Sequence, residues 1–251
     1  MKSVRPEPVE GFSRASTGSA RTGQVFAFSA LSASYFAHIG FFNPYLPLWL
    51  KDLGFGLLAI SVLTSVQSAT RLFAPYGWGW LSDHTGERVR LLRLGATAAL
   101  LVSVGLWFDM GSVALFVVLL LMFANTSGMM PMSEAALAHL VSGDGGFDAR
   151  RYGRVRVWGS LGFLVTVMAA GWWFEAFGMG SFPAWTALTL AAVALSAWCL
   201  PDAREPVLAE QARGRVWPVL RQRPVRWFFA AVFFHVLAHI FIYIFFSLYL
   251  D

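Results

Sequence analysis

The sequence contains a single cysteine, Cys199, in a chain of 251 residues. One thiol cannot form an intramolecular disulfide, so the disulfide framework of small secreted domains is excluded. Cys199 lies in an apolar run, where a free cysteine behaves as a small hydrophobic residue. We therefore assign it no chemical role.

Several patterns that support catalysis or cofactor binding are also missing. No group of Cys and His residues has the spacing of a metal site, so we predict no bound metal. The phosphate-binding pattern Gly-x-x-x-x-Gly-Lys-Ser/Thr is absent, which argues against transport driven by ATP. We find no HExxH motif, no paired carboxylates and no Ser/His/Asp arrangement. The sequence therefore predicts neither an enzyme nor a cofactor.

Charged residues are scarce, at 13% of the chain, whereas 57% of the residues are hydrophobic and the mean hydropathy is +0.59. The apolar residues come in blocks, and they carry more apolar surface than a soluble domain of this length can bury. A net charge of +5 would suggest nucleic-acid binding in a soluble protein. Here the basic residues lie in short segments between apolar runs. We therefore predict an all-α membrane protein whose partner is the lipid bilayer and not nucleic acid.

Seven apolar runs are long enough to cross a bilayer, whose hydrocarbon core of about 30 Å needs about 20 helical residues. We expect spans near residues 24–50, 56–80, 91–109, 112–137, 154–174, 181–200 and 226–250. The first run is longer than the core of a signal peptide, so we interpret it as a retained helix. Four prolines inside the runs should kink helices or free backbone groups for neighbouring helices to satisfy. These are Pro44, Pro47, Pro75 and Pro131.

The basic residues are distributed unevenly between the two sides of the membrane. If the N-terminus is cytoplasmic, all 19 Lys and Arg residues belong to cytoplasmic segments except Lys51, which is outside, and Arg71, which is within a span. Short cytoplasmic loops of membrane proteins carry such an excess of positive charge. The sequence therefore predicts a multi-pass protein of a bacterial-type inner membrane with a cytoplasmic N-terminus.

Polar stretches divide the chain into four parts. Residues 1–23 have almost no large apolar side chain and are expected to form a disordered cytoplasmic tail. Residues 24–200 hold six spans and should form one bundle. Residues 201–225 are the longest polar connection after the tail and are interpreted as a central cytoplasmic loop, followed by a seventh transmembrane helix at 226–251.

The seventh run repeats a theme of the first, because Ala37-His38-Ile39 has a counterpart in Ala238-His239-Ile240. Parallel repeats of this kind occur in transporters built from two similar halves. We therefore interpret the chain as the N-terminal part of a protein with twelve spans, stopping one helix into its second bundle. A chance likeness is an alternative, since the register needs a one-residue gap, and so is a protein that is naturally short.

A short charged segment, Gly79-Trp80-Leu81-Ser82-Asp83-His84-Thr85-Gly86-Glu87-Arg88-Val89-Arg90, separates the second and third runs. Gly79 would let another helix approach closely, Asp83 supplies an anion at the helix end, and Gly86 permits a turn with positive φ. Arg88 and Arg90 would hold the loop in the cytoplasm. By themselves, these residues also fit an ordinary loop.

The spacing Gly-x-Leu-Ser-Asp-x-x-Gly-x-Arg-x-Arg resembles the loop that major facilitator superfamily transporters carry between their second and third helices. His84 and Glu87 stand where that family usually has basic residues. The resemblance implies the six-helix N-terminal bundle of this superfamily, plus the first helix of the second bundle.

Ionisable side chains inside spans are functional candidates, because each one is costly in lipid unless it faces a partner or water. Arg71 could line a cavity and meet a substrate anion, or it could be neutralised by a neighbouring helix. Glu134 and Arg156 could pair if their helices pack antiparallel, and a substrate could exchange those contacts for its own. The alternative is an ion pair that only closes an inner gate. Arg154 and Arg156 are two residues apart and should point to nearly opposite sides of a helix, so only one can face the bundle interior and the other should reach interfacial water.

The segment pair Pro131-x-x-Glu134-Ala135 and Tyr152-Gly-Arg-x-Arg-x-Trp158-Gly resembles helices 4 and 5 of the oligosaccharide:proton symporters. The resemblance implies that Glu134 and Arg156 bind substrate, and that Ser160 and Phe163 occupy further positions of that site. Phe163 replaces a Trp on which a sugar ring stacks there, which puts galactosides in doubt. Trp158, beside the arginines, is a further candidate for stacking on a ring-shaped ligand.

The wider resemblance, over residues 25–251, is to the phenylpropionate and nucleoside permease branch of the same superfamily. His38 and His239 could relay protons, because an imidazole titrates near physiological pH, although most single membrane histidines only bond a neighbouring helix.

The leading hypothesis is a proton-coupled symporter that imports a small organic solute, such as an aromatic carboxylate, nucleoside or sugar, by alternating access. Proton coupling is inferred from the resemblance alone. The full-length protein is expected to be monomeric. The rivals are a non-transporting membrane assembly or scaffold protein on the same fold, and an inactive N-terminal fragment.

Overall fold

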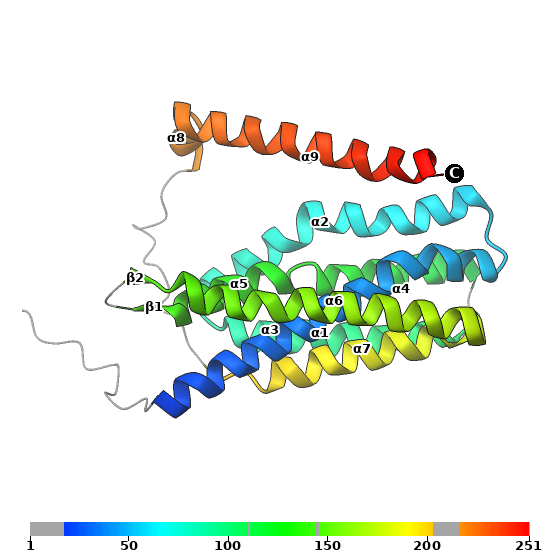
Figure 1. Ribbon diagram of the computed structural model, residues 1–251, viewed down its shortest axis with the longest axis horizontal. Helices are drawn as coiled ribbons and strands as arrows, with labels where there is room; N and C mark the ends of the chain where they lie inside the picture. Colours follow the sequence, from blue (N-terminus) through cyan, green and yellow to red (C-terminus); the bar gives the residue numbers. More distant parts are fainter. Residues whose placement is uncertain (1–17, 110, 144–145, 203–215, 251) are drawn as a thin grey trace, which may run out of the picture. The chain divides into compact units, whose positions relative to one another are not determined.

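The computed structural model describes residues 18–109, 111–143, 146–202 and 216–250, and side chains within 23–109, 111–142, 148–202 and 217–238 (Figure 1). The chain divides into two compact units, Met1–Val207 and Leu208–Asp251. In the second unit, the structure describes a short helix α8, Val216–Leu220, and a long helix α9, Arg223–Leu250.

The first unit is built from helices. In chain order they are α1 Gly18–Asp52, α2 Leu57–Thr85, α3 Arg88–Ser103, the 3₁₀ helix η1 Val104–Trp107, α4 Gly111–Thr126, α5 Met129–Val141, α6 Ala149–Phe177, the 3₁₀ helix η2 Met179–Ser181, and α7 Phe182–Trp198. Two very short strands, β1 Ser142–Gly143 and β2 Gly146–Phe147, pair antiparallel between α5 and α6. The predicted all-α fold class is confirmed.

Six segments of the described residues are long and apolar enough to cross a membrane. They are Gly23–Asp52, Leu57–Thr85, Arg88–Trp107, Gly111–Val141, Ala149–Phe177 and Met179–Trp198. Helices are the expected form, because a backbone in lipid must satisfy its polar groups within its own segment. The first six expected spans are found at these places.

Three details differ from the sequence-based expectations. Helix α1 begins at Gly18, inside the stretch expected as a tail, of which residues 1–17 lie outside the described part. Helix α2 continues to Thr85 instead of ending near 80, so the connection to α3 is only two residues long. The fourth span consists of two helices, α4 and α5. The seventh expected span coincides with α9.

The turn between α2 and α3 is closed by Gly86. This residue caps α2 with φ 66° and ψ 8°, in the left-handed region that favours glycine, and its N–H donates to the Ser82 carbonyl. Arg88 then donates to the Ser82 hydroxyl over 2.9 Å and to the Asp83 carboxylate over 3.1 Å. Arg90 pairs with Glu87 at 2.8 Å. The positive-φ turn predicted at Gly86 is therefore confirmed.

The close helix contact expected at Gly79 is not found among the described residues. A Cβ at Gly79 would meet nothing within 4 Å among the described residues, so no neighbouring backbone approaches it in this part of the chain. Gly79 lies inside α2, six residues before the helix ends at Thr85, and not in the loop.

Helix α1 packs most extensively on α6 and next on α7 (Figure 1). Glycines allow the α1–α6 approach. A Cβ at Gly162 of α6 would overlap the Ala33 carbonyl oxygen, and one at Gly40 of α1 would lie 2.7 Å from the Phe163 carbonyl oxygen. Any side chain at these positions would push the two helices apart.

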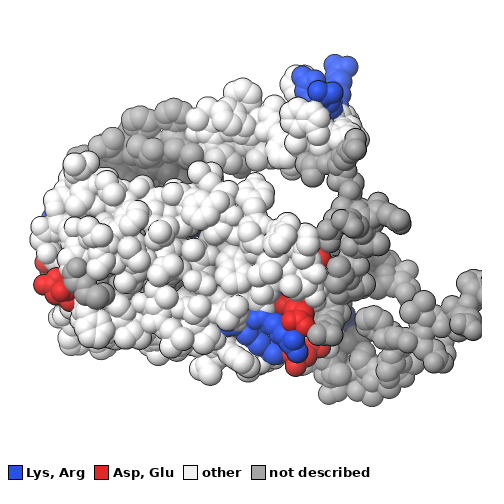
Figure 2. All heavy atoms as spheres, turned by 180° about the vertical axis from the view of Figure 1, so that it is seen from behind, with Lys and Arg blue, Asp and Glu red and all other residues white. Residues whose placement is uncertain are grey.

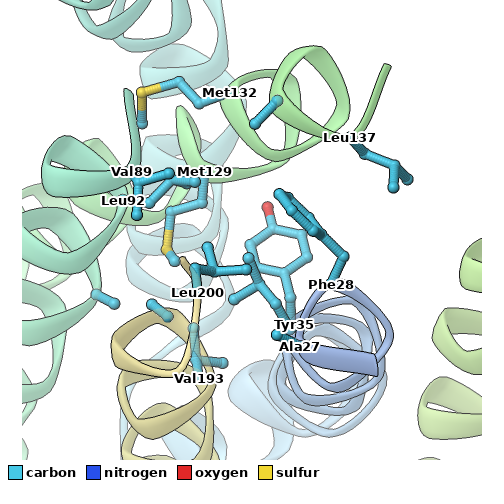
Figure 3. Close-up of a cluster of buried hydrophobic side chains, with 14 of the residues drawn as sticks. Ala27, Phe28, Tyr35, Val89, Leu92, Met129, Met132, Leu137, Val193 and Leu200 are labelled. Atoms are coloured by element: carbon cyan, nitrogen blue, oxygen red, sulfur yellow. The ribbon is translucent and has the colours of Figure 1, made fainter. Parts of the chain in front are cut away.

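Two apolar clusters fill the bundle. One is rich in aromatic rings, with Phe41 and Phe42 of α1 fully buried against Phe182, which also stacks on Trp49 with ring centroids 4.8 Å apart. The other joins α1, α3, α5 and α7 around Phe28, Leu92, Met129 and Val193, and Tyr35 is its polar member (Figure 3).

Arg93 fastens the end of α7. Its guanidinium donates to the Ala197 and Leu200 carbonyls and to the Asp202 carboxylate, over 3.3, 2.5 and 2.5 Å. It also lies over the Trp198 ring, 5.3 Å from the centroid. An arginine near a helix C-terminus binds carbonyls that lack partners within the helix.

Charged side chains gather towards the ends of the bundle on the face in Figure 2, and the surface between them is uncharged. Many large apolar side chains on the long helices are exposed, including Leu57, Leu72, Val113 and Met168. Such a surface fits contact with lipid, and the protein is a multi-pass membrane protein.

Replacing Gly162 by Ala should destabilise the bundle by about 1–3 kcal/mol, the usual cost of overpacking, because the added methyl overlaps the α1 backbone. The matched change Gly77→Ala adds a methyl to an exposed helical glycine with nothing within 4 Å. It should be neutral or stabilising, since Ala is the better helix former. Thermal unfolding in detergent checks both, and equal shifts in midpoint would contradict the close contact.

Candidate functional site

The fourth span is interrupted at its centre. Helix α4 ends at Thr126 and α5 begins at Met129, with a turn at Ser127 and Gly128 between them. Pro131 explains the position of the break, because it has no N–H to donate to the Ser127 carbonyl and is best tolerated in the first turn of a helix. Interrupted helices near the middle of the membrane often line binding sites.

Side chains from two other helices satisfy carbonyls at this break. The indole N–H of Trp78 in α2 donates to the Ala124 carbonyl over 2.8 Å. The hydroxyl of Tyr35 in α1 donates to the Thr126 carbonyl over 3.3 Å. Gly128 makes room for the Trp78 ring, which a Cβ there would overlap. The break is thus tied to α1 and α2.

A small polar recess adjoins the break. Its cavity volume is about 20 Å³, little more than the space for one water. The lining comes from α1, α2, α4 and the turn after α4: Tyr35, His38, Ile39, Phe42, Asn43, Gln67, Arg71, Phe123, Thr126 and Ser127. The recess therefore combines one cation and several hydrogen-bonding groups with apolar and aromatic walls.

Arg71 is the charged member of this recess. It is the central residue of α2, about 21 Å along the helix from Thr85 by the rise of an α-helix. Its side chain is exposed at the surface of the first unit, and no described residue forms an ion pair or hydrogen bond with it. A cation at this depth needs an anion or water, as expected from the sequence.

Two polar pairs support the recess. Gln67, one turn before Arg71, donates its amide to Asn43 of α1 over 2.7 Å. His38 is buried, with Nδ1 3.0 Å from the Thr189 hydroxyl of α7. This contact with a neighbouring helix matches the alternative to a proton relay, although His38 also borders the recess. The side chain of His239, the other proposed relay, lies outside the described residues.

Glu134 and Arg156 are brought together as expected. Arg156 Nη1 of α6 donates to Glu134 Oε1 of α5, and the two side chains are 39% and 37% exposed. The Arg156 guanidinium also lies over the Phe36 ring, 5.4 Å from its centroid. Arg154 is exposed on another side of the helix, as predicted.

The pair and Arg71 lie at different depths. Glu134 is seven residues before the end of α5 and Arg156 seven residues after the start of α6, or about 10 Å from those helix ends. Arg71 is about twice as far from the end of α2. The structure therefore shows two charged groups along the span and no single cluster.

The other candidates on α6 divide between two faces. Ser160 and Phe163 follow Arg156 by four and seven residues, so they share its face, and both are exposed. Trp158 is 53% exposed and lies about 200° around the helix from Arg156. The structure does not bring Trp158 to the ion pair.

Sequence reasoning missed the uncharged members of the site. Asn43 and Gln67 are amides within apolar runs, and that signal was available in the sequence. The parts played by Tyr35 and Trp78 carried no such signal, because each depends on a carbonyl freed in a distant helix.

Comparison with known proteins adds the family. The model of the MFS_1 like family matches residues 28–251, most of the chain. The chain belongs to this family.

Its relatives are transporters by name and not enzymes. The chain is 35% identical over 179 residues to a maltose permease of Geobacillus stearothermophilus, covering 70% of this chain and 43% of that protein. Among solved structures, it is similar in fold to a mutant of the peptide transporter POT in complex with sulfate. That match has a TM-score of 0.57 and 18% identity, and it covers 91% of this chain and 48% of the other. The chain spans less than half the length of both relatives.

Replacing Trp78 by Phe should destabilise the protein by about 1–3 kcal/mol, because the Ala124 carbonyl would lose its donor in an apolar setting. The control Trp80→Phe changes an exposed ring on the same helix and should stay within about 0.5 kcal/mol. Thermal unfolding in detergent measures both. A loss as large for Trp80→Phe would show that the indole bond does not secure the break.

Proposed function

We propose that this chain is the N-terminal part of a proton-coupled secondary transporter that carries a small organic solute across the inner membrane by alternating access. The observation that carries the proposal is the combination of Arg71, a cation at the centre of a span with no partner among the described residues, and a partly exposed ion pair, Glu134–Arg156, on the same bundle. Family membership supports it, as do the names of the relatives.

The chemistry of the site selects among solutes. Arg71 can bind a carboxylate, while Glu134 and Arg156 can exchange their mutual contact for hydroxyl or acidic groups of a solute. Amide and aromatic groups of the recess suit a compact solute with a ring. We therefore keep aromatic carboxylates, nucleosides and sugars as the candidates, with Arg71, Glu134, Arg156, Ser160 and Phe163 as binding residues.

Proton coupling requires a titratable group that the proton gradient can reach. His38 borders the recess but is already bonded to Thr189. The coupling ion is therefore tested separately, by measuring uptake with and without an inward proton gradient.

The second candidate is a membrane assembly or scaffold protein on the same fold. It would need no binding residue in the interior, so Arg71 and the ion pair should then tolerate neutral replacement.

In the complete gene product, Glu134→Gln and Arg156→Ala should each reduce solute uptake at least 10-fold, because each leaves one charge without its partner and removes a contact to the solute. The measurement is uptake of radiolabelled maltose, uridine and 3-phenylpropionate into vesicles. Arg154→Ala is the control, since Arg154 is exposed and lies off the face of the pair. Normal uptake with both variants inserted in the membrane would reject the site.

The cytoplasmic N-terminus can be tested with single cysteines, after Cys199→Ser removes the exposed native thiol. Gly180→Cys in η2 should react with a membrane-impermeant maleimide on intact cells. Ala149→Cys at the start of α6 should react only after permeabilisation, because the arginines beside it favour the cytoplasm. The opposite pattern would invert the topology.

A further inference from the structure

A second small space, mostly apolar, lies near the Arg71 recess, and Tyr35 of α1 belongs to the walls of both. This second cavity has a volume of about 10 Å³, about the least that can hold one water. It lies between α1 and α5. Its remaining walls are Leu31, Ser32, Met129, Met130 and Ser133.

Ser32 gives this cavity a polar atom that needs a partner. The residue is 5% exposed, and its hydroxyl is the only buried side-chain oxygen or nitrogen in the described part of the chain that has no hydrogen bond. Buried hydroxyls without a partner are costly, and a water in a polar cavity removes the cost. Gly159 of α6 packs against Ser32, since a Cβ there would lie 2.7 Å from the Ser32 oxygen.

Ser133, which lines the second cavity, directly precedes Glu134 of the ion pair in α5. The recess on the other side of Tyr35 holds Arg71. Tyr35 therefore lies between the recess that holds Arg71 and the cavity that Ser133 lines.

The hydrogen bond that holds Tyr35 is a weak one. Its hydroxyl reaches the Thr126 carbonyl over 3.3 Å, longer than the usual range of about 2.5–3.0 Å between two oxygens. Figure 3 shows the Tyr35 ring extending from α1 into the cluster that contains Met129. The ring fills space while its polar end is loosely held, so the side chain can be displaced more easily than its burial suggests.

We propose that Tyr35 is a barrier within the bundle: its ring separates the Arg71 recess from the water-sized cavity at Ser32 and Ser133, and a solute that extends from the recess into this cavity must displace the ring. The proposal rests on the proposed function for the solute, whereas the barrier belongs to the bundle itself. A solute that enters both spaces carries an acidic group for Arg71 and a hydrogen-bonding group for the Ser32 hydroxyl. A shorter anion stays on the Arg71 side of the ring.

The barrier can be tested by labelling a cysteine at position 32. In the complete gene product without its native cysteines, Ser32→Cys is exposed to methanethiosulfonate ethylammonium, a small water-soluble reagent, and labelling is followed by mass spectrometry. Tyr35→Ala should speed labelling at least 10-fold, because removing the ring joins the cavity to the recess. Tyr35→Phe should leave labelling slow, because the ring remains.

Tyr45→Ala is the matched control. It removes a second tyrosine of α1, whose hydroxyl donates to the Val167 carbonyl over 3.0 Å and whose ring borders neither space. Equal acceleration by Tyr45→Ala would show general loosening and overturn the proposal, as would fast labelling with Tyr35 in place. If Tyr35→Ala does not insert, Tyr35→Val must give the acceleration, and unchanged labelling in that variant overturns the barrier. Uptake is not part of this readout, so a protein that transports none of the tested solutes still gives a decisive result.

Discussion

The contact between the backbones of α1 and α6 is the constraint on which the bundle depends. Glycines on both helices remove the side chains that would hold them apart, so Gly162 meets the Ala33 carbonyl and Gly40 meets Phe163. Lipid offers no hydrophobic force between helices, so close van der Waals contact has to supply the association. Because α6 also carries Arg156, the same contact sets that guanidinium over Phe36 of α1. Packing and site are therefore fixed by one pair of helices.

Charge is placed in this bundle at two depths, and the two groups differ in kind. The two charges of the Glu134–Arg156 ion pair neutralise each other and are partly exposed to solvent. The pair therefore costs little free energy, and a solute can replace the contact between its members. Arg71 has no such compensation within the described residues and faces a recess of amides and hydroxyls. A structural role would be served as well by an uncharged residue at the centre of α2. The cost of keeping a cation there is the strongest argument for a solute or a water path.

The spans and the ion pair were predictable from the sequence, because both follow from the bilayer as a solvent. A helix of about 20 apolar residues and a charge that needs a partner are local signals. The break in the fourth span could be predicted only in part from the sequence. Pro131 and Gly128 indicate a weak point, but the donors that stabilise it come from residues 46 and 91 positions away in the chain.

Two other differences between the sequence-based expectations and the structure concern Trp158 and Gly79. The angle of about 200° between Arg156 and Trp158 follows from helix geometry, so their separation was available without a structure. That no described residue approaches Gly79 could not be read from the sequence, because helix contacts are set by the whole bundle. The water-sized cavity at Ser32 could not be predicted from the sequence either, because it too depends on contacts between helices. It lies between α1 and α5, and its lining comes from side chains of both helices.

Arg93 also holds the chain beyond the end of α7. Its bonds to Leu200 and Asp202 keep the backbone attached to the bundle for four residues after the helix has ended at Trp198. A load applied to the chain at Asp202 would therefore reach α3, through Arg93, as well as α7.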